Sequence, residues 1–274
     1  MKPLKTIAMC AAVAFAMSCG QKKDSRILVL YYSQTGNTRA VAEQISSLLG
    51  APTEEIVALN PYDGGFRETI ERCLKEREAG ILPEVKPLAA NLDAYDVVFL
   101  GYPVWFGTYA PPVAAMLEQI NLEGKTVVPF CTFGSGGLES SSIDLAVRQP
   151  GAKLLPGYGV RAARMAEMPK EIDRFLKSSG FIEGEYPVLD DFPVQHPVSE
   201  EEAAIFDAAV DGYPMLSASA STVASRSHPE GTEYLFHAVE KPRGGNDDMP
   251  PAGTIQVYVL AKDGVTPVFT RVVR

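Results

Sequence analysis

Between Arg26 and Gly180, short apolar runs alternate with longer amphipathic stretches, and this alternation constrains the fold more than any other feature of the sequence. Apolar runs of strand length separated by helix-length segments are typical of a parallel sheet with helices on both faces. Because crossover connections between parallel strands are right-handed, few topologies remain. The sequence therefore predicts an α/β fold with a doubly wound, five-stranded parallel sheet.

The same pattern gives the boundaries of the predicted elements. Strands are predicted at residues 26–32, 53–59, 96–102, 126–132 and 152–160. Helices are predicted at residues 37–49, 66–80, 111–120 and 169–180, where apolar residues recur at helical spacing. Gly80 and Gly180 suit positions just past helix ends, and Pro169 suits a first helical turn.

The composition changes beyond residue 182, the predicted end of a domain that begins at residue 26. Residues 183–198 are polar, aromatic and proline-bearing, which predicts a linker. A small α+β domain is predicted at residues 199–274, beginning with a helix at 199–212 whose capping box is Ser199 and Glu202. Its antiparallel sheet is predicted from four alternating segments, with residues 241–253 as an exposed connector: 215–226, 232–241, 254–262 and 266–274.

Residues 1–18 have the features of an export signal: two lysines, an apolar stretch, and small residues before Cys19. The apolar stretch is shorter than the roughly 20 residues of a comfortable bilayer span. The segment resembles a bacterial lipoprotein signal, in which the cysteine is lipidated and becomes the mature N-terminus, although Ala16 replaces the favoured leucine. The alternatives are an ordinary secretory signal or an uncleaved N-terminal anchor. With Cys19 lipidated, residues 19–25 would form a short polar tether.

The net charge limits the class of partner, and the positions of the cysteines limit the disulfides that can form. Loss of the two signal lysines takes the formal net charge from −9 to −11, which argues against nucleic acid or an anionic lipid surface as a partner. Cys10 and Cys19 fall in or next to the signal, which leaves Cys73 in a predicted helix and Cys131 at the end of a predicted strand. We expect two free, buried thiols, with a Cys73–Cys131 disulfide as the alternative.

The segment "SQTGNT" joins the first predicted strand to the first predicted helix and is rich in hydrogen-bond donors. Ser33, Thr35 and Thr38 carry hydroxyls, Asn37 carries an amide, and Gly36 allows close backbone approach. A helix N-terminus also offers unpaired N–H groups and the positive end of the helix dipole, so this segment is predicted to hold an anion such as a phosphate monoester.

Two nucleotide-binding motifs are missing here, since no GxxxxGK[ST] and no GxGxxG follows the first strand. The remaining alternative is an ordinary capped turn. In a doubly wound sheet, however, ligands bind outside the carboxyl ends of the strands. The loops after the third and fourth strands, "GYPVWFGTYAPP" and "CTFGSGGLESSS", would therefore meet the "SQTGNT" segment. An aromatic-rich and a glycine-rich loop beside a phosphate site suit a flat aromatic ligand that ends in a phosphate.

The stretches "ILVLYYSQTGNT", "YDVVFLGYPVWFGT" and "GKTVVPFCTFGSGG" together resemble the flavodoxin family, in its branch with "GYPxW" and "PFCT" motifs, over about residues 26–180. The resemblance implies a flavodoxin-like sheet of strand order 2-1-3-4-5 and FMN as a non-covalent cofactor. It places the phosphate on Ser33, Gln34, Thr35, Gly36, Asn37 and Thr38. It places the ring edge against backbone of Pro103, Val104, Trp105, Phe106, Thr132, Phe133, Gly134, Ser135 and Gly137.

Trp105, the only tryptophan, is the candidate for stacking on the flavin, and its alternative role is a buried side chain that fixes the loop. Tyr102 and Phe133 are weaker candidates for the same contact. Cys131 is more easily explained as a small buried hydrophobic residue than as a redox thiol. No catalytic side chain and no metal ligand set is predicted, because all three histidines lie beyond the flavodoxin-like part.

The expected function is an FMN-binding redox protein of the bacterial cell envelope, lipid-anchored and periplasmic or associated with the outer membrane. It would be either an electron carrier with a partner protein or a small reductase of the NAD(P)H or quinone type. The alternative is a non-catalytic envelope lipoprotein that binds partners through this scaffold and its C-terminal domain. That domain resembles the cystatin fold, but the inhibitory QxVxG motif falls on residues 227–231 and only Gly231 is kept.

Overall fold

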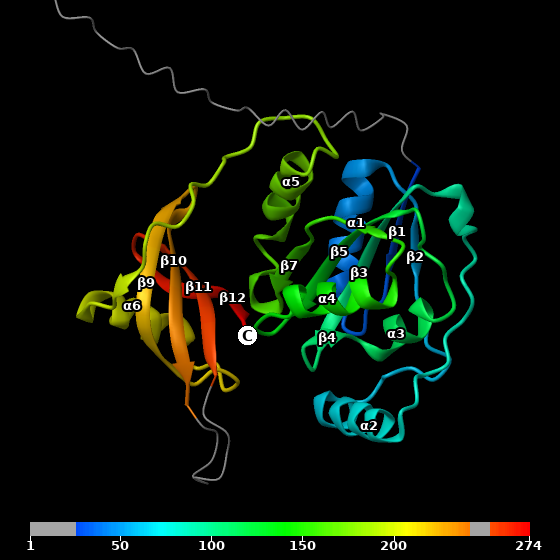
Figure 1. Ribbon diagram of the computed structural model, residues 1–274, viewed down its shortest axis with the longest axis horizontal. Coiled ribbons are helices and arrows are strands. Elements are labelled where there is room, and N and C mark those ends of the chain that lie inside the picture. The colour runs from blue at the N-terminus through cyan, green and yellow to red at the C-terminus, as the bar shows by residue number, and fades with distance from the viewer. Residues whose placement is uncertain (1–25, 242–252) are drawn as a thin grey trace, which may run out of the picture.

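The computed structural model describes residues 26–241 and 253–274, which form two domains, each with its own sheet (Figure 1). In the first domain, the strand order β2-β1-β3-β5-β6 is parallel throughout, β7 continues beside β5, and the short β4 pairs antiparallel with β3. This confirms the predicted flavodoxin-like sheet. The strands are β1 Ile27–Tyr31, β2 Thr53–Glu55, β3 Val97–Trp105, β4 Thr108–Tyr109, β5 Thr126–Phe133, β6 Lys153–Leu154 and β7 Tyr158–Arg161.

Helices cover both faces of this sheet. On one face, α1 and α5 bury Val41, Ile45 and Ile172 against the strands, and on the other face α3 and α4 bury Val113 and Leu145. The helices are α1 Asn37–Leu49, α2 Phe66–Ala79, α3 Pro111–Leu117, α4 Leu138–Arg148 and α5 Met168–Ser178, with 3-10 turns η1 Leu92–Ala94 and η2 Ala162–Arg164.

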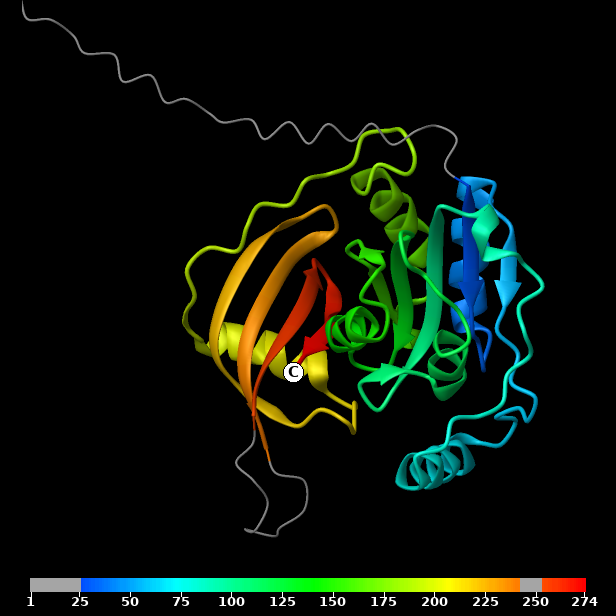
Figure 2. The ribbon, with the colours of Figure 1, turned by 45° about the vertical axis from the view of Figure 1, so that its right-hand side comes forward.

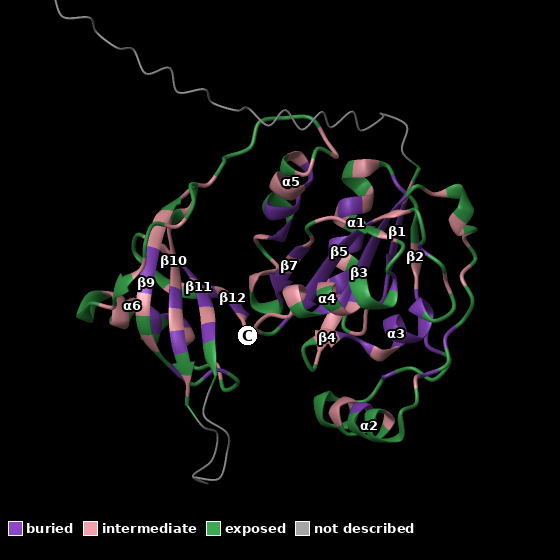
Figure 3. Cartoon of the chain, viewed as in Figure 1, coloured by how far each residue is buried: buried purple, intermediate pink, exposed green. Residues whose placement is uncertain are grey.

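Burial is concentrated in the central strands, and α2 lies to one side with most of its surface exposed (Figure 3). Its only buried residue is Cys73. Cys73 and Cys131 are both free and buried, as expected. None of the helices in the described residues is both long enough and apolar enough to span a membrane.

Several elements differ from the sequence prediction. The strand predicted at 53–59 ends at Glu55, and the strand predicted at 152–160 is divided into β6 and β7. Helix α4 occupies residues that were read as part of a glycine-rich loop, because it buries only Ser141 and Leu145 and so lacks an apolar repeat. Strand β3 runs on to Trp105 and turns back into β4, so Pro103, Val104 and Trp105 lie in a hairpin rather than a loop. Strand β5 likewise extends one residue beyond its predicted end, to Phe133.

The second domain is an antiparallel sheet in the order β12-β11-β10-β9-β8, and α6 lies across one of its faces (Figure 2). Phe206 of α6 packs into the sheet core beside Phe236, with ring centroids 5.2 Å apart. The Ser199–Glu202 capping box is present. The elements are β8 His196–Pro197, α6 Glu200–Val210, β9 Ala218–His228, β10 Gly231–Glu240, β11 Thr254–Lys262 and β12 Val265–Val273.

Strand β8 was not predicted, because two residues inside a linker-like segment carry no periodic signal. The predicted signal, Cys19 and most of the predicted 241–253 connector lie outside the described residues.

Candidate cofactor-binding site

A cavity of about 1190 Å³ opens at the carboxyl ends of β1, β3 and β5, where a doubly wound sheet binds its ligand. Loops of the first domain form most of its wall. The second domain supplies the rest. The lining residues lie at 34–35, 64–66, 69–70, 73, 104–107, 134–137, 139–140, 213, 215, 217, 240–241, 253 and 272–274.

The N-terminus of α1 is open toward an anion. Its N-cap is Gly36, whose φ of 92° is a conformation that favours glycine, and no side chain in the described part of the chain caps the helix. The Ser33 hydroxyl instead accepts a hydrogen bond from the Gly36 N–H at 3.2 Å, within the turn. Thr35 is exposed and lines the cavity. The first-turn N–H groups and the Thr35 hydroxyl are the groups that could hold an anion at this turn.

Thr38 lies behind this turn and is only 1% exposed. Its Oγ1 is 2.8 Å from Oγ1 of Thr132, so the pair ties the start of α1 to the end of β5. Two hydroxyls that share one hydrogen bond still hold a second hydrogen. The pair can therefore give one donor to a ligand at the helix N-terminus, while it also holds the two elements together.

Gln34 has a different use from the one predicted for its side chain. Its Nε2 donates to the Tyr62 carbonyl at 2.8 Å and to Thr69 Oγ1 at 2.9 Å. The amide thereby anchors the 62–69 segment beside the cavity, which leads into α2. That segment was missed by sequence reasoning, and its one available signal was the Gly64–Gly65 pair before the helix.

Trp105 forms an aromatic part of the wall and is fixed in place by two tyrosines. Its ring centroid lies 6.1 Å from Tyr32 and 5.2 Å from Tyr62, in edge-to-face arrangements at 86° and 69°. Arg72 from α2 lies over the Tyr62 ring at 3.7 Å. Burial raises the pKa of Tyr32 to about 12, so this phenol stays neutral and does not put charge beside the indole. Both roles considered for Trp105, loop anchor and ligand contact, are compatible with this position.

The turn after Trp105 is strained. Phe106 has a φ of 52° and Gly107 a φ of 82°, as in the two-residue turns of type I′ hairpins. A left-handed conformation costs a residue other than glycine about 1–2 kcal/mol. Phe106 is nevertheless 48% exposed and lines the cavity, with the Arg77 guanidinium 5.6 Å from its ring. Strained residues of this kind concentrate at ligand sites.

The loop after β5 contacts this hairpin closely. Gly137 has a φ of 120°, and a Cβ there would lie 2.5 Å from Cγ1 of Val104, so only glycine allows the approach. Gly134, Ser135 and Gly136 continue the same wall.

The structure brings the predicted residues together at one end of the sheet. The cavity is lined by Gln34, Thr35, Val104, Trp105, Phe106, Gly134, Ser135 and Gly137. Outside the lining are the half-buried Ser33, Gly36, Asn37 and Pro103 and the buried Thr38, Thr132 and Phe133. Tyr102 and Phe133 belong to the buried core.

Among the described residues that line the cavity, no acid–base pair stands out. Burial raises the pKa of Cys73 to about 11 and that of Cys131 well above its ordinary value, so both thiols are protonated at neutral pH. Glu139 lines the cavity and pairs with Arg271 at 3.2 Å. Within residues 26–241 and 253–274, no group of three or more potential metal ligands is gathered.

A doubly wound sheet with an uncapped helix N-terminus and an aromatic wall at the carboxyl ends of its strands is typical of nucleotide-binding α/β proteins. Within that class, a family model described as Flavodoxin matches residues 26–172, more than half of the chain. The chain belongs to the flavodoxin family.

Solved structures that resemble the chain match a little over half of it. A candidate flavoprotein from Bacteroides eggerthii DSM 20697 is 30% identical with a TM-score of 0.50, over 57% of this chain and 98% of that one. A flavoprotein from Lactobacillus acidophilus NCFM, solved in complex with FMN, is 23% identical with a TM-score of 0.45, over 54% and 98%.

FMN is the cofactor of the flavodoxin family, and the residues of the cavity fit it. The open N-terminus of α1 beside the Thr35 hydroxyl suits a phosphate monoester, and the aromatic wall at Trp105 suits a flat ring. The absence of a lysine from residues 33–38 agrees with a monoester rather than a triphosphate.

Proposed function

We propose that the protein is an FMN-dependent redox protein of the bacterial cell envelope, either a small reductase or an electron carrier. The observation that carries the proposal is that Thr35, next to the uncapped N-terminus of α1, and Trp105 line one cavity at the carboxyl ends of the strands. FMN phosphate would be held by Thr35 and the first-turn N–H groups of α1. Its ring would lie along Trp105 and the loop at 134–137.

The energies of these contacts are sufficient. Each hydrogen bond to a charged phosphate oxygen contributes about 1.5–3 kcal/mol, and a stacked aromatic contributes about 1–3 kcal/mol. Micromolar affinity requires about 8 kcal/mol. Three phosphate contacts and one stacking contact together contribute about 5.5–12 kcal/mol, a range that includes this value.

Bound FMN supplies the electron and hydride transfer, and the chain supplies orientation and electrostatics. Glu139 is the lining carboxylate of the 134–140 segment, and its pairing with Arg271 balances its charge. The wall near the ring would thus add little net negative charge. Trp105 packs against the buried core of the first domain, which keeps water away from the far side of this part of the wall.

The first experiment tests cofactor binding. The chain from residue 20 onward is purified and titrated with FMN, and we expect quenched flavin fluorescence and a shifted absorption band. The absence of binding at tens of micromolar, on the order of 6 kcal/mol or less, would contradict the proposal. If FMN binds, oxidation of NADH or NADPH in the presence of a quinone identifies a reductase, and its absence favours a carrier.

The envelope location rests on the sequence of residues 1–19. We expect the full chain, expressed in a bacterium fed labelled fatty acid, to incorporate the label, and Cys19→Ala to abolish it. An unlabelled wild-type chain in the soluble fraction would argue for an ordinary secretory signal instead, and label retained by Cys19→Ala would contradict Cys19 as the lipidation site.

A further inference from the structure

The second domain is joined to the wall of the cavity by its edge strand. The Val272 N–H of β12 donates to the Ser135 carbonyl at 2.6 Å. A Cβ on Gly136 would lie 1.9 Å from the Val272 carbonyl oxygen, so the two backbones meet where only glycine fits. Because β12 is at the edge of its sheet, its outward hydrogen-bonding groups are free to pair with the first domain.

A buried arginine holds the same junction from the other side. Arg161, at the end of β7, is 8% exposed. Its Nε donates to the Gly134 carbonyl at 2.8 Å and its Nη1 to the Phe269 carbonyl at 2.7 Å, with the guanidinium 3.4 Å from the centroid of the Phe269 ring. One side chain thus fixes the cavity loop and β12 in a common register.

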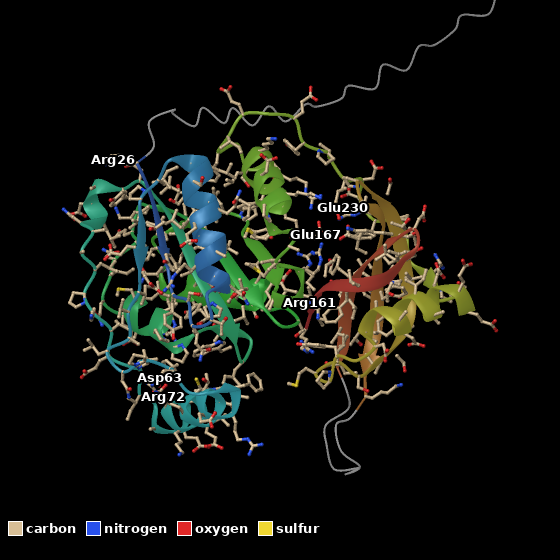
Figure 4. All side chains as sticks on the ribbon, turned by 180° about the vertical axis from the view of Figure 1, so that it is seen from behind. Arg26, Asp63, Arg72, Arg161, Glu167 and Glu230 are labelled. Atoms are coloured by element: carbon tan, nitrogen blue, oxygen red, sulfur yellow. The ribbon has the colours of Figure 1, made fainter. Side chains whose placement is uncertain are left out.

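Ion pairs extend this junction. Arg271 pairs with Glu139 at 3.2 Å, and Lys262 pairs with Glu230 of its own domain and lies 3.8 Å from Glu167 of the first domain. Figure 4 shows Arg161, Glu167 and Glu230 along the boundary between the two domains. A backbone hydrogen bond, a buried arginine and ion pairs all hold the two domains together at this boundary, so the second domain forms a fixed part of the cavity wall.

The cavity is larger than a typical site for one drug-sized molecule. A site for one drug-sized molecule measures about 300–1,000 Å³, and this cavity is larger, at about 1190 Å³. The predicted FMN contacts all lie in the first domain. The part bounded by Met215, Ser217 and Val273 remains on the side of the second domain.

Among the described residues, the lining on that side is largely apolar, with contributions from Tyr213, Met215, Val272 and Val273. Its charged members are Arg274 and Glu240, which pair at 2.9 Å between Nη2 and Oε1, and Lys241, which is exposed to solvent. Burying an unpaired ionic ligand against such a wall is costly, whereas an uncharged flat molecule has no such cost.

We propose that the second domain forms a binding subsite for a small, flat, uncharged molecule, which is the redox partner at this site in place of a partner protein. The proposal rests on the proposed function, since the subsite faces the cofactor. By covering the cavity, β12 and the segment around Met215 admit a small molecule and keep a protein surface away from the ring.

The test uses the chain from residue 20 onward, loaded with oxidised FMN, so that no turnover occurs. Binding of 2-methyl-1,4-naphthoquinone is measured by calorimetry in wild type and in Met215→Trp, with Met215→Leu as the matched control. Met215 is 47% exposed, so the larger ring should be tolerated by the fold. Ser217→Trp, also at an exposed lining position, is the second variant.

We expect both tryptophan variants to weaken quinone binding at least about tenfold while the affinity for FMN and the Met215→Leu control stay within about threefold of wild type. We also expect a sulfonated naphthoquinone to bind about tenfold more weakly than the uncharged one. Quinone binding that the tryptophan variants leave unchanged, or equal loss of FMN, would overturn the subsite. After chemical reduction, oxidation by cytochrome c as fast as by the quinone would overturn the exclusion of proteins. Failure of the wild type to bind FMN would instead refute the proposed function.

Discussion

Replacing Thr35 by alanine tests the phosphate site with little disturbance of the fold. Thr35 is exposed, lines the cavity, and lies one residue before the N-cap of α1. Its hydroxyl has room to donate to a phosphate oxygen, and a hydrogen bond to a charged group contributes about 1.5–3 kcal/mol. Since 1.4 kcal/mol is a factor of ten, the affinity for FMN should fall about 10–150-fold.

The assay is fluorescence titration with FMN and with riboflavin, which has the same ring and lacks the phosphate. Riboflavin affinity should change less than about threefold, because riboflavin has no phosphate to lose a contact and a surface substitution shifts the free energy of unfolding by only about 0.5 kcal/mol. Thr53→Ala, at an exposed threonine outside the cavity, is the matched control. Equal losses for both ligands in Thr35→Ala would refute the assignment of the phosphate to this turn.

Thr38 is less suited to this test. It is 1% exposed and shares a hydrogen bond with Thr132. Removing its hydroxyl would leave Thr132 without that partner in the interior, which costs about 1–3 kcal/mol of stability. A loss of FMN affinity in Thr38→Val would therefore combine a ligand effect with a folding effect.

Three further predictions follow from strain, burial and charge. Phe106→Asn should raise the free energy of unfolding, measured in urea titrations, by about 1 kcal/mol, because asparagine accepts a left-handed backbone conformation more readily than phenylalanine. The same substitution should lower the affinity for FMN. A lower free energy of unfolding would contradict the strain at Phe106. Burial and the nearby Arg174 lower the pKa of His228, so on acidification the unfolded chain takes up this proton before the folded chain does, and stability should fall as the pH drops below about 6.5. In His228→Gln this part of the pH dependence should be lost. An unchanged slope of stability against pH in that variant would argue against a role for His228. Cys73 and Cys131 should react with a thiol reagent only after unfolding, and rapid labelling of the native chain would show that one of them is accessible.

The first domain was predictable because its signals are local and repeated. Helix α1 has the predicted bounds, since Val41 and Ile45 recur at helical spacing and Gly50 ends the helix in a left-handed conformation. Helix α4 was missed because it buries little beyond Leu145. The strand order of the sheet was predicted from the family resemblance. The alternation of apolar runs predicted a parallel sheet but not the order of its strands.

Only the parts of the candidate site that directly follow the parallel strands were predictable from the sequence. Parallel strands bring their carboxyl ends to one edge, so the turn at Thr35 and the hairpin at Trp105 could be placed together. The wall from the second domain was not predictable. Its contacts with the first domain run through the backbones of Val272 and Gly136 and through one arginine, Arg161, and such contacts leave no periodic pattern in the sequence.

The most direct test of the account is a crystal structure of the chain in complex with FMN. We predict phosphate oxygens within hydrogen-bonding distance, about 2.7–3.2 Å, of the Thr35 hydroxyl and the first-turn N–H groups of α1. We predict the ring beside Trp105, with space left on the side of Met215. FMN bound elsewhere on the molecule, or in this cavity with its phosphate away from α1, would contradict the account.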